Sequence, residues 1–416
     1  MRKTGIIILG LRLVISLAGC QELDKLTYGK PVKRPKTVDI SEQNEIVTDF
    51  AVRLLQNTFN GEDNVLLSPV SILSGLSLIA NGADGESLAQ IERAVGMSAE
   101  EMNAYLYSYT HQLSENWDTD NKLHIANSLW INKDKNITVS DEFLKKNEMY
   151  HDASIFYTEF DQSCVEDTNK WIREKTDGKV DEIMNEIPED AGMYLANSLV
   201  YEGVWPEKVY SNKEENFGIS FDSISSGNKG LTIIQEREHF YLEDTSACGF
   251  MKYLEHGKYA FAALIPDENT DIQTYVQHLS GKRLRTILSN PEHKEYEVGI
   301  WMPQFSYDYE QDVVDVLMRM GIREVFDREI AEFSIFCIER EEEALYVEQF
   351  KHAASINVNA HGVNTDRRLS YSLKSMYSAR FELGSSYSVY LNRPFLIAII
   401  DCEHNVPLLL GVVNNI

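Results

Sequence analysis

Residues Leu345 to Pro394 read LYVEQFKHAASINVNAHGVNTDRRLSYSLKSMYSARFELGSSYSVYLNRP. The first part, as far as Val358, has the β-branched and aromatic content of a strand. From Gly362 to Pro394 the sequence then offers no helix cap, no internal proline and little helical period. A long segment without secondary structure is uncommon inside a compact domain, and it is usually a functional loop or disordered. Because this one is rich in large apolar residues, we expect an exposed loop that presents itself to a partner.

The composition is that of a large globular protein. The chain has 416 residues, of which 43% are hydrophobic and 25% charged, and its formal net charge is −26. One large domain or two ordinary ones would fit this length. The negative charge argues against a protein that tracks nucleic-acid phosphates and against adsorption to anionic lipid. We therefore expect no nucleic-acid partner.

The N-terminus has the pattern of an export signal. Arg2 and Lys3 precede a short apolar run that ends in Leu17-Ala18-Gly19-Cys20, which resembles the lipobox of bacterial lipoproteins. This predicts a signal peptide over residues 1–19, lipidation of Cys20 and attachment to a membrane through that lipid. The alternative is an ordinary signal peptide with a chance cysteine. Cleavage would remove three basic residues, so the mature charge would be −26 − 3 = −29.

Residues 20–40 are predicted to be a basic, proline-containing tether between lipid and domain. We expect an exported lipoprotein of the outer membrane or cell surface, with its domain facing the outside or the periplasm.

The remaining chain, residues 41–416, shows no break in composition and is predicted to be one domain. Helical patterns come first; one begins at Ser68-Pro69, a capping residue followed by proline. Strand patterns dominate later and include Met193–Tyr201. Hairpins rather than regular βαβ units indicate an α+β fold.

Motifs of catalysis and metal binding are missing from the sequence. We find no GxSxG, HExxH, GxxxxGK[ST] or GxGxxG pattern, and we predict no enzyme activity and no cofactor. Cys164, Cys248, Cys337 and Cys402 lie far apart without CxxC spacing, so a zinc site is not expected. A disulfide is open in an exported protein, but buried free thiols are the preferred interpretation.

Six segments, in order, resemble one known family. They are Asn64–Ile72, Asn81–Gly85, Leu195–Trp205, Met302–Phe305 with Met320–Ile322, Asn392–Leu396 and Leu410–Asn414. Together they identify the chain as similar to the serpins, in a bacterial lipoprotein form. The resemblance implies about nine helices, three β-sheets and an exposed reactive loop at about residues 360–388.

The resemblance also implies a mechanism. A target serine protease, or a papain-like cysteine protease, cleaves the reactive loop and forms an acyl-enzyme. The freed loop then enters the central sheet as a new strand and carries the trapped protease with it. A monomer is expected to act in this way.

Several residues match positions where family members open their sheet. Ser68, Ser71, Asn197 and His352 match the shutter cluster, although they could also be ordinary satisfied buried polar residues. Gly203 and Trp205 match the region where the loop begins to enter, although a tryptophan there also packs in the core.

The hinge of the loop departs from the inhibitory pattern. It comprises Gly362, Val363, Asn364, Thr365 and Arg367. Inhibitory serpins have an acidic pair where this chain has Ala360 and His361, a threonine at the position of Val363, and a run of alanines in place of Thr365–Arg368. In an inserted strand, one face would carry Val363, Thr365, Arg367, Leu369, Tyr371 and Leu373. Arg367 would thus face the interior, where an unpaired guanidinium costs several kcal/mol.

The scissile bond is predicted by counting from Gly362 in the family's manner, which gives Met376-Tyr377. The alternatives are Lys374, Arg380 and Leu383, the last reached by counting back from Pro394. Two functions stay open: a surface-anchored inhibitor of serine proteases, and a non-inhibitory substrate or binding protein with the same fold.

Overall fold

The computed structural model describes residues 25–27, 30–115, 121–135, 137–151, 153–187, 192–207, 209–214, 231–289, 291–339, 345–364 and 387–416. These residues form nine α-helices and three sheets, which confirms the expected α+β class. The helices are α1 Ser41–Thr58, α2 Pro69–Ala80, α3 Gly85–Val95, α4 Ala99–Glu115, α5 Asp141–Tyr150, α6 Gln162–Lys175, α7 Ile272–Gln277, α8 Gly281–Ser289 and α9 Val314–Arg319.

The central sheet has seven strands in the order β1-β5-β3-β6-β15-β14-β12. Their bounds are β1 Lys25–Leu26, β5 Ser154–Thr158, β3 Asn121–Asn132, β6 Met193–Val204, β15 Gly362–Asn364, β14 Val347–Asn359 and β12 Phe305–Asp312. The middle of this sheet therefore combines strands from distant parts of the chain, and β15 begins at the predicted hinge.

A second sheet of nine strands forms the other half of the molecule, with the order β16-β11-β8-β9-β10-β17-β18-β2 and β7 paired to β8. Its strands are β16 Tyr387–Tyr390, β11 Glu292–Pro303, β8 Leu231–Glu243, β9 Ala247–Tyr253, β10 Tyr259–Pro266, β17 Phe395–Asp401, β18 Val406–Val413, β2 Val65–Leu67 and β7 Tyr210–Glu214. The third sheet pairs β13 Cys337–Glu339 with β4 Thr138–Val139.

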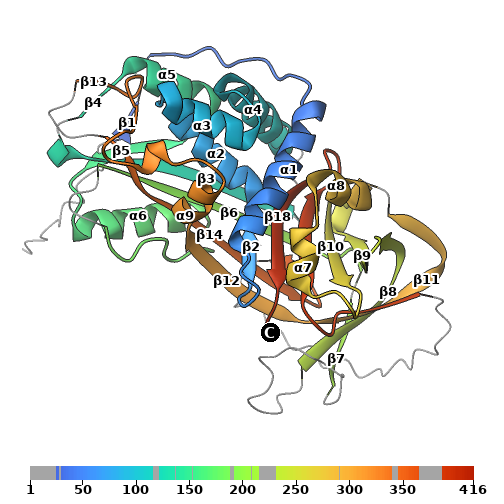
Figure 1. The fold of residues 1–416 in the computed structure, drawn as a ribbon. Helices are drawn as coiled ribbons and strands as arrows, with labels where there is room; N and C mark the ends of the chain where they lie inside the picture. The colour runs from blue at the N-terminus through green and yellow to red at the C-terminus, as the bar shows by residue number, and fades with distance from the viewer. Residues whose placement is uncertain are drawn as a thin grey trace, which may run out of the picture.

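The central sheet lies between two groups of helices, with α2 to α5 on one side and α6 on the other (Figure 1). On the α2 side, all twelve residues of α2 are buried, as expected for a helix that is apolar all round. Gly75 permits this close approach, because a Cβ there would lie 2.4 Å from Phe350 Cζ. Ser68 caps the helix by accepting a hydrogen bond from the Ser71 N–H, as the sequence predicted.

A separate apolar cluster fills the α6 side of the sheet. It includes Trp171 and Ile172 of α6, Trp130 of β3, Ala196 of β6 and Ala353 of β14. The central strands are consequently covered on both faces. This matters for function, because any strand added between β6 and β14 must place side chains into two apolar layers.

Residues predicted to form the tether contact the domain at several points. Lys25–Leu26 pairs with β5 at the sheet edge, and the Val38 N–H donates to Ser108 Oγ at 3.0 Å. Lys30 Nζ also lies 3.7 Å from Asp141 Oδ2. The predicted signal peptide and Cys20 lie outside the described residues.

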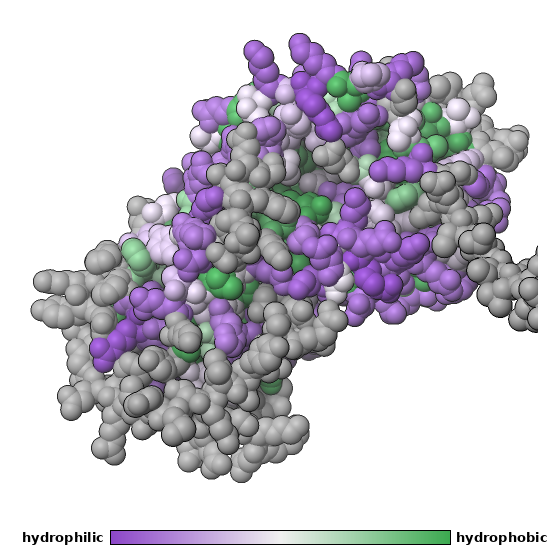
Figure 2. All heavy atoms as spheres, turned by 180° about the vertical axis from the view of Figure 1, so that it is seen from behind, coloured by the Kyte–Doolittle hydropathy of each residue, from purple (hydrophilic) through white to green (hydrophobic). Residues whose placement is uncertain are grey.

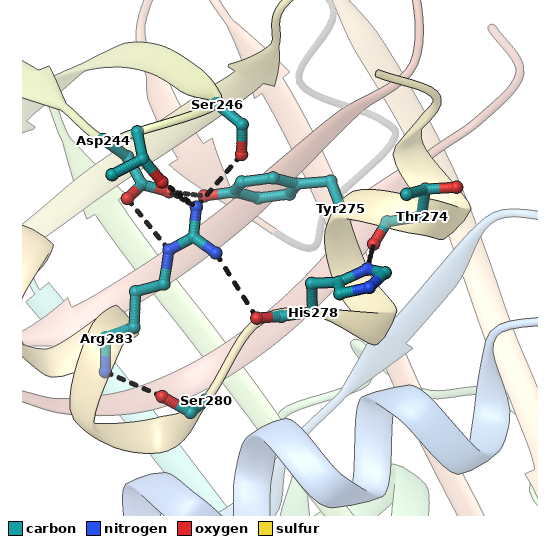
Figure 3. Close-up of polar contacts among 8 residues, drawn as sticks. Asp244, Ser246, Thr274, Tyr275, His278, Ser280 and Arg283 are labelled. Atoms are coloured by element: carbon teal, nitrogen blue, oxygen red, sulfur yellow. Dashed lines mark hydrogen bonds and ion pairs between the residues drawn. The ribbon is translucent and has the colours of Figure 1, made fainter.

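A partly buried ion pair fastens α7 and α8 to the turn between β8 and β9 (Figure 3). The Arg283 guanidinium donates to both oxygens of Asp244, at 2.9 and 2.6 Å, and lies 5.5 Å from the Tyr275 ring centre. Tyr275 Oη donates to the same carboxylate, and Arg283 also donates to Thr245 and Ser246. Burial alone would raise the pKa of Asp244, but the hydrogen bonds from Arg283 and its neighbours hold it below its usual value.

The surface seen from behind carries mainly hydrophilic side chains, with smaller apolar areas between them (Figure 2). Within the described part of the chain, no helix has the length and hydropathy to cross a bilayer. The four cysteines after Cys20 are free thiols, with Cys164 and Cys337 buried and Cys248 and Cys402 partly exposed.

We predict that Asp244→Ala lowers the free energy of unfolding by about 2–3 kcal/mol, because it leaves Arg283 without its carboxylate. This is below the usual cost for a fully buried pair, since a quarter of the Arg283 side chain is exposed. The depressed folded-state pKa means that Asp244 stabilises the protein above the unfolded pKa of about 3.9, and that this contribution is lost as the pH falls through the lower folded value.

Urea unfolding at pH 7 measures the effect of Asp244→Ala. Glu86→Ala is the matched control, because Glu86 pairs with Arg93 on the surface, where ion pairs contribute little. Equal midpoint shifts in the two variants would contradict the structural role assigned to Asp244.

Candidate functional site

The hinge residues Gly362–Asn364 form a short strand, β15, that lies between β6 and β14. It is antiparallel to β14, with Val358 opposite Val363 and Asn359 opposite Gly362. It is also antiparallel to β6, with Gly203 opposite Val363. The first residues of the predicted hinge are thus already seated as a strand of the central sheet.

The positions of Gly362 and Val363 in the sheet determine which face each later residue would occupy in an extended β15. Val363 is 1% exposed and packs in the main core on the α2 side. Gly362 sits where a side chain has no room, because a Cβ would lie 2.1 Å from the carbonyl oxygen of Gly203. Since side chains alternate along a strand, odd-numbered residues beyond Val363 would face the α2 side if the strand were extended.

Lower in the sheet, β6 and β14 pair directly with each other. Their parallel register runs from Val347 opposite Met193 to Ala353 opposite Ser198. This closed part of the sheet occupies the place that an extended β15 would need. Opening it requires that the ladder between β6 and β14 be broken.

The predicted shutter residues meet beneath this closed part. The Ser68 N–H donates to His352 Nε2 at 3.2 Å, and the Ser71 N–H donates to Ser68 Oγ at 3.4 Å. All three residues are fully buried. Asn197 lies opposite His352 in the register of β6 and β14, and its side chain is outside the described part.

Burial lowers the pKa of His352 to about 3. The imidazole is therefore neutral at physiological pH, and its Nε2 is the acceptor for the Ser68 N–H. A neutral ring avoids placing a charge under the strands that would have to separate.

The predicted entry region is held by hydrogen bonds to the hinge turn. Trp205 Nε1 donates to the Asn359 carbonyl at 2.9 Å, and the Trp205 N–H donates to the His361 carbonyl at 3.0 Å. Gly203 adjoins Trp205 through Val204 and pairs with Val363. Trp205 thus ties the end of β6 to the turn from which β15 starts.

The charged group that lies next to the Trp205 ring was not predicted from the sequence. Lys252 Nζ lies 5.5 Å from the Trp205 ring centre, pairs with Glu238 and lies 3.9 Å from Glu236 Oε2. Burial raises the pKa of Glu236, although the charge of Lys252 opposes this. The sequence signal was the acid–basic–acid alternation Glu236-Arg237-Glu238, which is typical of any exposed strand and did not indicate a partner.

Other predicted site residues cannot be placed. Thr365, Arg367, the proposed scissile pair Met376 and Tyr377, and the alternatives Lys374, Arg380 and Leu383 lie outside the described residues. Among the described residues, no group of three or more His, Cys, Asp or Glu side chains is arranged to hold a metal ion.

Comparisons with known proteins identify the family. The model of the Serpin family, described as serine protease inhibitor, matches residues 45–416, and the chain therefore belongs to the serpins. Leukocyte elastase inhibitor of Equus caballus is 25% identical over 332 residues, which cover 76% of this chain and 85% of that protein. Corticosteroid-binding globulin of Homo sapiens is 24% identical over 366 residues, covering 85% of each chain.

Solved structures of tengpin, a thermophilic serpin, agree with this placement. Its native state matches with a TM-score of 0.82 at 30% identity, covering 93% of this chain and 97% of that one. Its latent state matches with a TM-score of 0.77 at 29% identity, covering 92% and 99%. The described fold is thus more similar to the native than to the latent form.

We predict that the fold becomes less stable in mild acid, because His352 binds a proton in the unfolded chain and not in the folded protein. Between its unfolded pKa of about 6.5 and its folded value of about 3, only the unfolded chain binds the extra proton, so stability falls as the pH falls. From pH 6.5 to 4.5 this amounts to about 2 kcal/mol. Wild type should lose this much more stability than His352→Gln, which does not titrate, when urea midpoints are compared.

A third measurement at pH 8.0 serves as the control. There the two proteins should differ only by the fixed cost of the substitution. If both lose the same stability between pH 6.5 and 4.5, His352 does not titrate as its burial requires.

Proposed function

We propose that this protein inhibits serine proteases by reactive-loop cleavage, covalent trapping and insertion of the loop into the central sheet. Papain-like cysteine proteases are a second target class. The observation that carries the proposal is the seating of Gly362–Asn364 between β6 and β14, with pairing to both strands. Membership of the serpin family supports a protease-inhibitor type of fold.

The chemical step uses the protease's own machinery. The protease serine Oγ bonds to the Met376 carbonyl carbon, the bond to the Tyr377 nitrogen breaks, and the proton passes to that nitrogen. The residues up to Met376 stay esterified to the protease. They can then extend β15 as a strand, provided that insertion is faster than hydrolysis of the ester.

The register of β15 is compatible with cleavage at Met376-Tyr377 and equally with cleavage after Lys374. The pairs Val363–Val358 and Val363–Gly203, continued downward, place residue 373 opposite Met193, the first residue of β6. A loop cut after Met376 would therefore fill the available strand with little excess. A cut at Leu383 would leave a longer tail, whereas Lys374 falls almost at the strand end.

The same register separates the two arginines of the hinge. Arg367 would lie between Leu199 and Ala354, which face the main core and are at most 2% exposed. Arg368 would lie on the opposite face, between Ser198 and Ala353. In the next strand, Glu310 of β12 lies opposite Ala353 and is exposed.

A guanidinium extended across the small Ala353 side chain can reach this edge carboxylate and water. Burial raises the pKa of Glu310, so a new cationic neighbour would relieve an unfavourable charge. Arg368 is therefore compatible with insertion, and Arg367 is the residue that opposes it.

We predict that Arg367→Thr increases trapping several-fold, because it removes a guanidinium that costs several kcal/mol to bury. Arg368→Thr is the matched variant on the other face and should leave trapping unchanged or reduce it. Arg328→Thr removes an exposed arginine outside the reactive loop and is the neutral control. The measurement is the ratio of covalent complex to cleaved protein on a denaturing gel with chymotrypsin, elastase and subtilisin.

Mass spectrometry of the released peptide would locate the bond in the same samples. If every protease cleaves the loop, none is trapped, and Arg367→Thr does not restore trapping, the inhibitory function is wrong.

The second candidate is a serpin that serves as a substrate or binding protein without inhibiting. Arg367 is the observation that favours it, and corticosteroid-binding globulin among the relatives is a named binding protein of this family. Cleavage without complex in all variants would favour this function.

We further propose that the protein is exported, anchored by a lipid on Cys20 and monomeric, with the domain on the outer surface or in the periplasm. The lipobox-like Leu17-Ala18-Gly19-Cys20 carries this part. Cys20→Ser should move the protein from the membrane to the soluble fraction, because the lipid would be its only anchor. Fractionation and radiolabelled palmitate incorporation test it, and Cys402→Ser is the control.

A variant Cys20→Ser that remains in the membrane fraction would contradict lipid anchoring. Incorporation of radiolabelled palmitate into this variant would also contradict lipid anchoring.

A further inference from the structure

A pocket of about 490 Å³ lies between α4, β3 and the ends of α5 and α6. Its walls come from α2, α4, β3, α5 and α6, and Arg34 of the N-terminal segment lies at it as well. The volume is within the range of natural small-molecule sites. Its β3 wall lies close to the hinge, because Leu123 is opposite Tyr201 of β6, two residues before Gly203, which pairs with Val363.

The side chains around the pocket are unusual for this chain. Arg34, His111, His124, His151 and Lys175 line it, and none of its fourteen described lining residues is acidic. The chain as a whole has 65 acidic and 39 basic residues. Five basic side chains therefore line a single pocket in a strongly acidic protein.

The remaining lining gives the pocket an apolar body. Leu106 and Leu113 of α4 and Leu123 of β3 are buried at its wall. Tyr107 lies beside it, with its ring centre 6.4 Å from that of Tyr150 in an edge arrangement and 5.9 Å from that of His111. An apolar wall with basic groups around it is complementary to a molecule with an apolar body and an anionic head.

The basic residues are held at the wall by contacts with their neighbours. His151 Nε2 donates to Asn103 Oδ1 at 2.6 Å, within a buried network that joins α2 and α4. His124 Nε2 lies 3.7 Å from Asp177 Oδ2, an exposed carboxylate outside the lining set. Arg34 Nη1 donates to the Met149 carbonyl at 3.3 Å, which holds the guanidinium beside the end of α5.

We propose that this pocket is a binding site for a small amphipathic anion, a carboxylate or sulfonate with an aromatic or aliphatic body. Its head group is held by Lys175, Arg34 and the histidines, and its body packs on Leu106, Leu123 and Tyr107. One wall belongs to β3, which pairs with β6 from Asn121 to Ile131. A bound anion would therefore connect the part of the central sheet that contains β3 to α4.

The first test is a pair of fluorescent probes that share a body and differ in charge. The anion 1-anilinonaphthalene-8-sulfonate should bind at one site, and the uncharged N-phenyl-1-naphthylamine should bind roughly tenfold more weakly. Dodecanoate should displace the sulfonate probe, and dodecanol should do so poorly.

Two charge variants on α6 locate the site. Lys175→Glu should weaken the sulfonate probe roughly tenfold and leave the uncharged probe unchanged. Lys170→Glu makes the same change of net charge on the same helix outside the lining, and should leave both affinities unchanged. Both positions are exposed, so both variants should fold.

The proposal is overturned if the two probes bind equally, or if Lys175→Glu leaves the sulfonate probe unaffected. It is also overturned if Lys170→Glu weakens binding as much as Lys175→Glu, since the effect would then be general electrostatics. A third variant, Thr110→Trp, fills the pocket and should abolish binding of both probes; retained binding in a folded variant places the probe elsewhere.

Discussion

The parallel pairing of β6 with β14 is the interaction on which the rest of the molecule depends. It closes the central sheet from Met193 to Ser198, over the buried Ser68 and His352. Just above, β15 pairs with both strands in the antiparallel sense. Extension of β15 would therefore replace one parallel ladder by two antiparallel ones, and antiparallel pairing is the more stable per residue. The sheet as described is closed, but a better-paired arrangement is available to it.

The groups around this pairing keep the exchange possible. A neutral His352 and small serines lie where strands must separate, so no buried charge has to be broken apart. Gly362 allows the hinge to lie against Gly203, because any side chain at position 362 would collide with the backbone there. The Arg283–Asp244 pair lies in the other half of the molecule and holds α7 and α8 to the nine-stranded sheet. The ion pair thus lies in one half of the molecule, while the strands that would have to separate during loop insertion lie in the other.

The fold was largely predictable from the sequence because its signals are local. Ser68-Pro69 marked a helix start, and the run from Met193 marked a buried strand; both are where the pattern placed them. β12 was missed, although Phe305, Tyr307 and Tyr309 alternate with polar residues. The Arg283–Asp244 pair could not be foreseen, because its partners are 39 residues apart. Nor could the pocket at Lys175, whose walls are brought together only by the packing of several helices on β3.

Individual residues of the candidate site could be predicted from the sequence, but their arrangement in space could not. Family resemblance named Gly203, Trp205, Gly362 and the shutter residues, but only the register shows that Val363 already lies in the core. That register separates Arg367, which would face the core, from Arg368, which would face an edge carboxylate. The alternation of residues in the loop sequence assigned them to two faces of a strand, but it did not show which elements would cover each face.

Thermal unfolding of the protein before and after a single cut in the reactive loop tests the central claim most directly. If the freed segment enters between β6 and β14, the cut protein exchanges one parallel strand ladder for two antiparallel ones, and its midpoint should rise by at least about 10 °C. An unchanged or lower midpoint after complete cleavage would show that the loop stays out of the sheet, and would contradict the account.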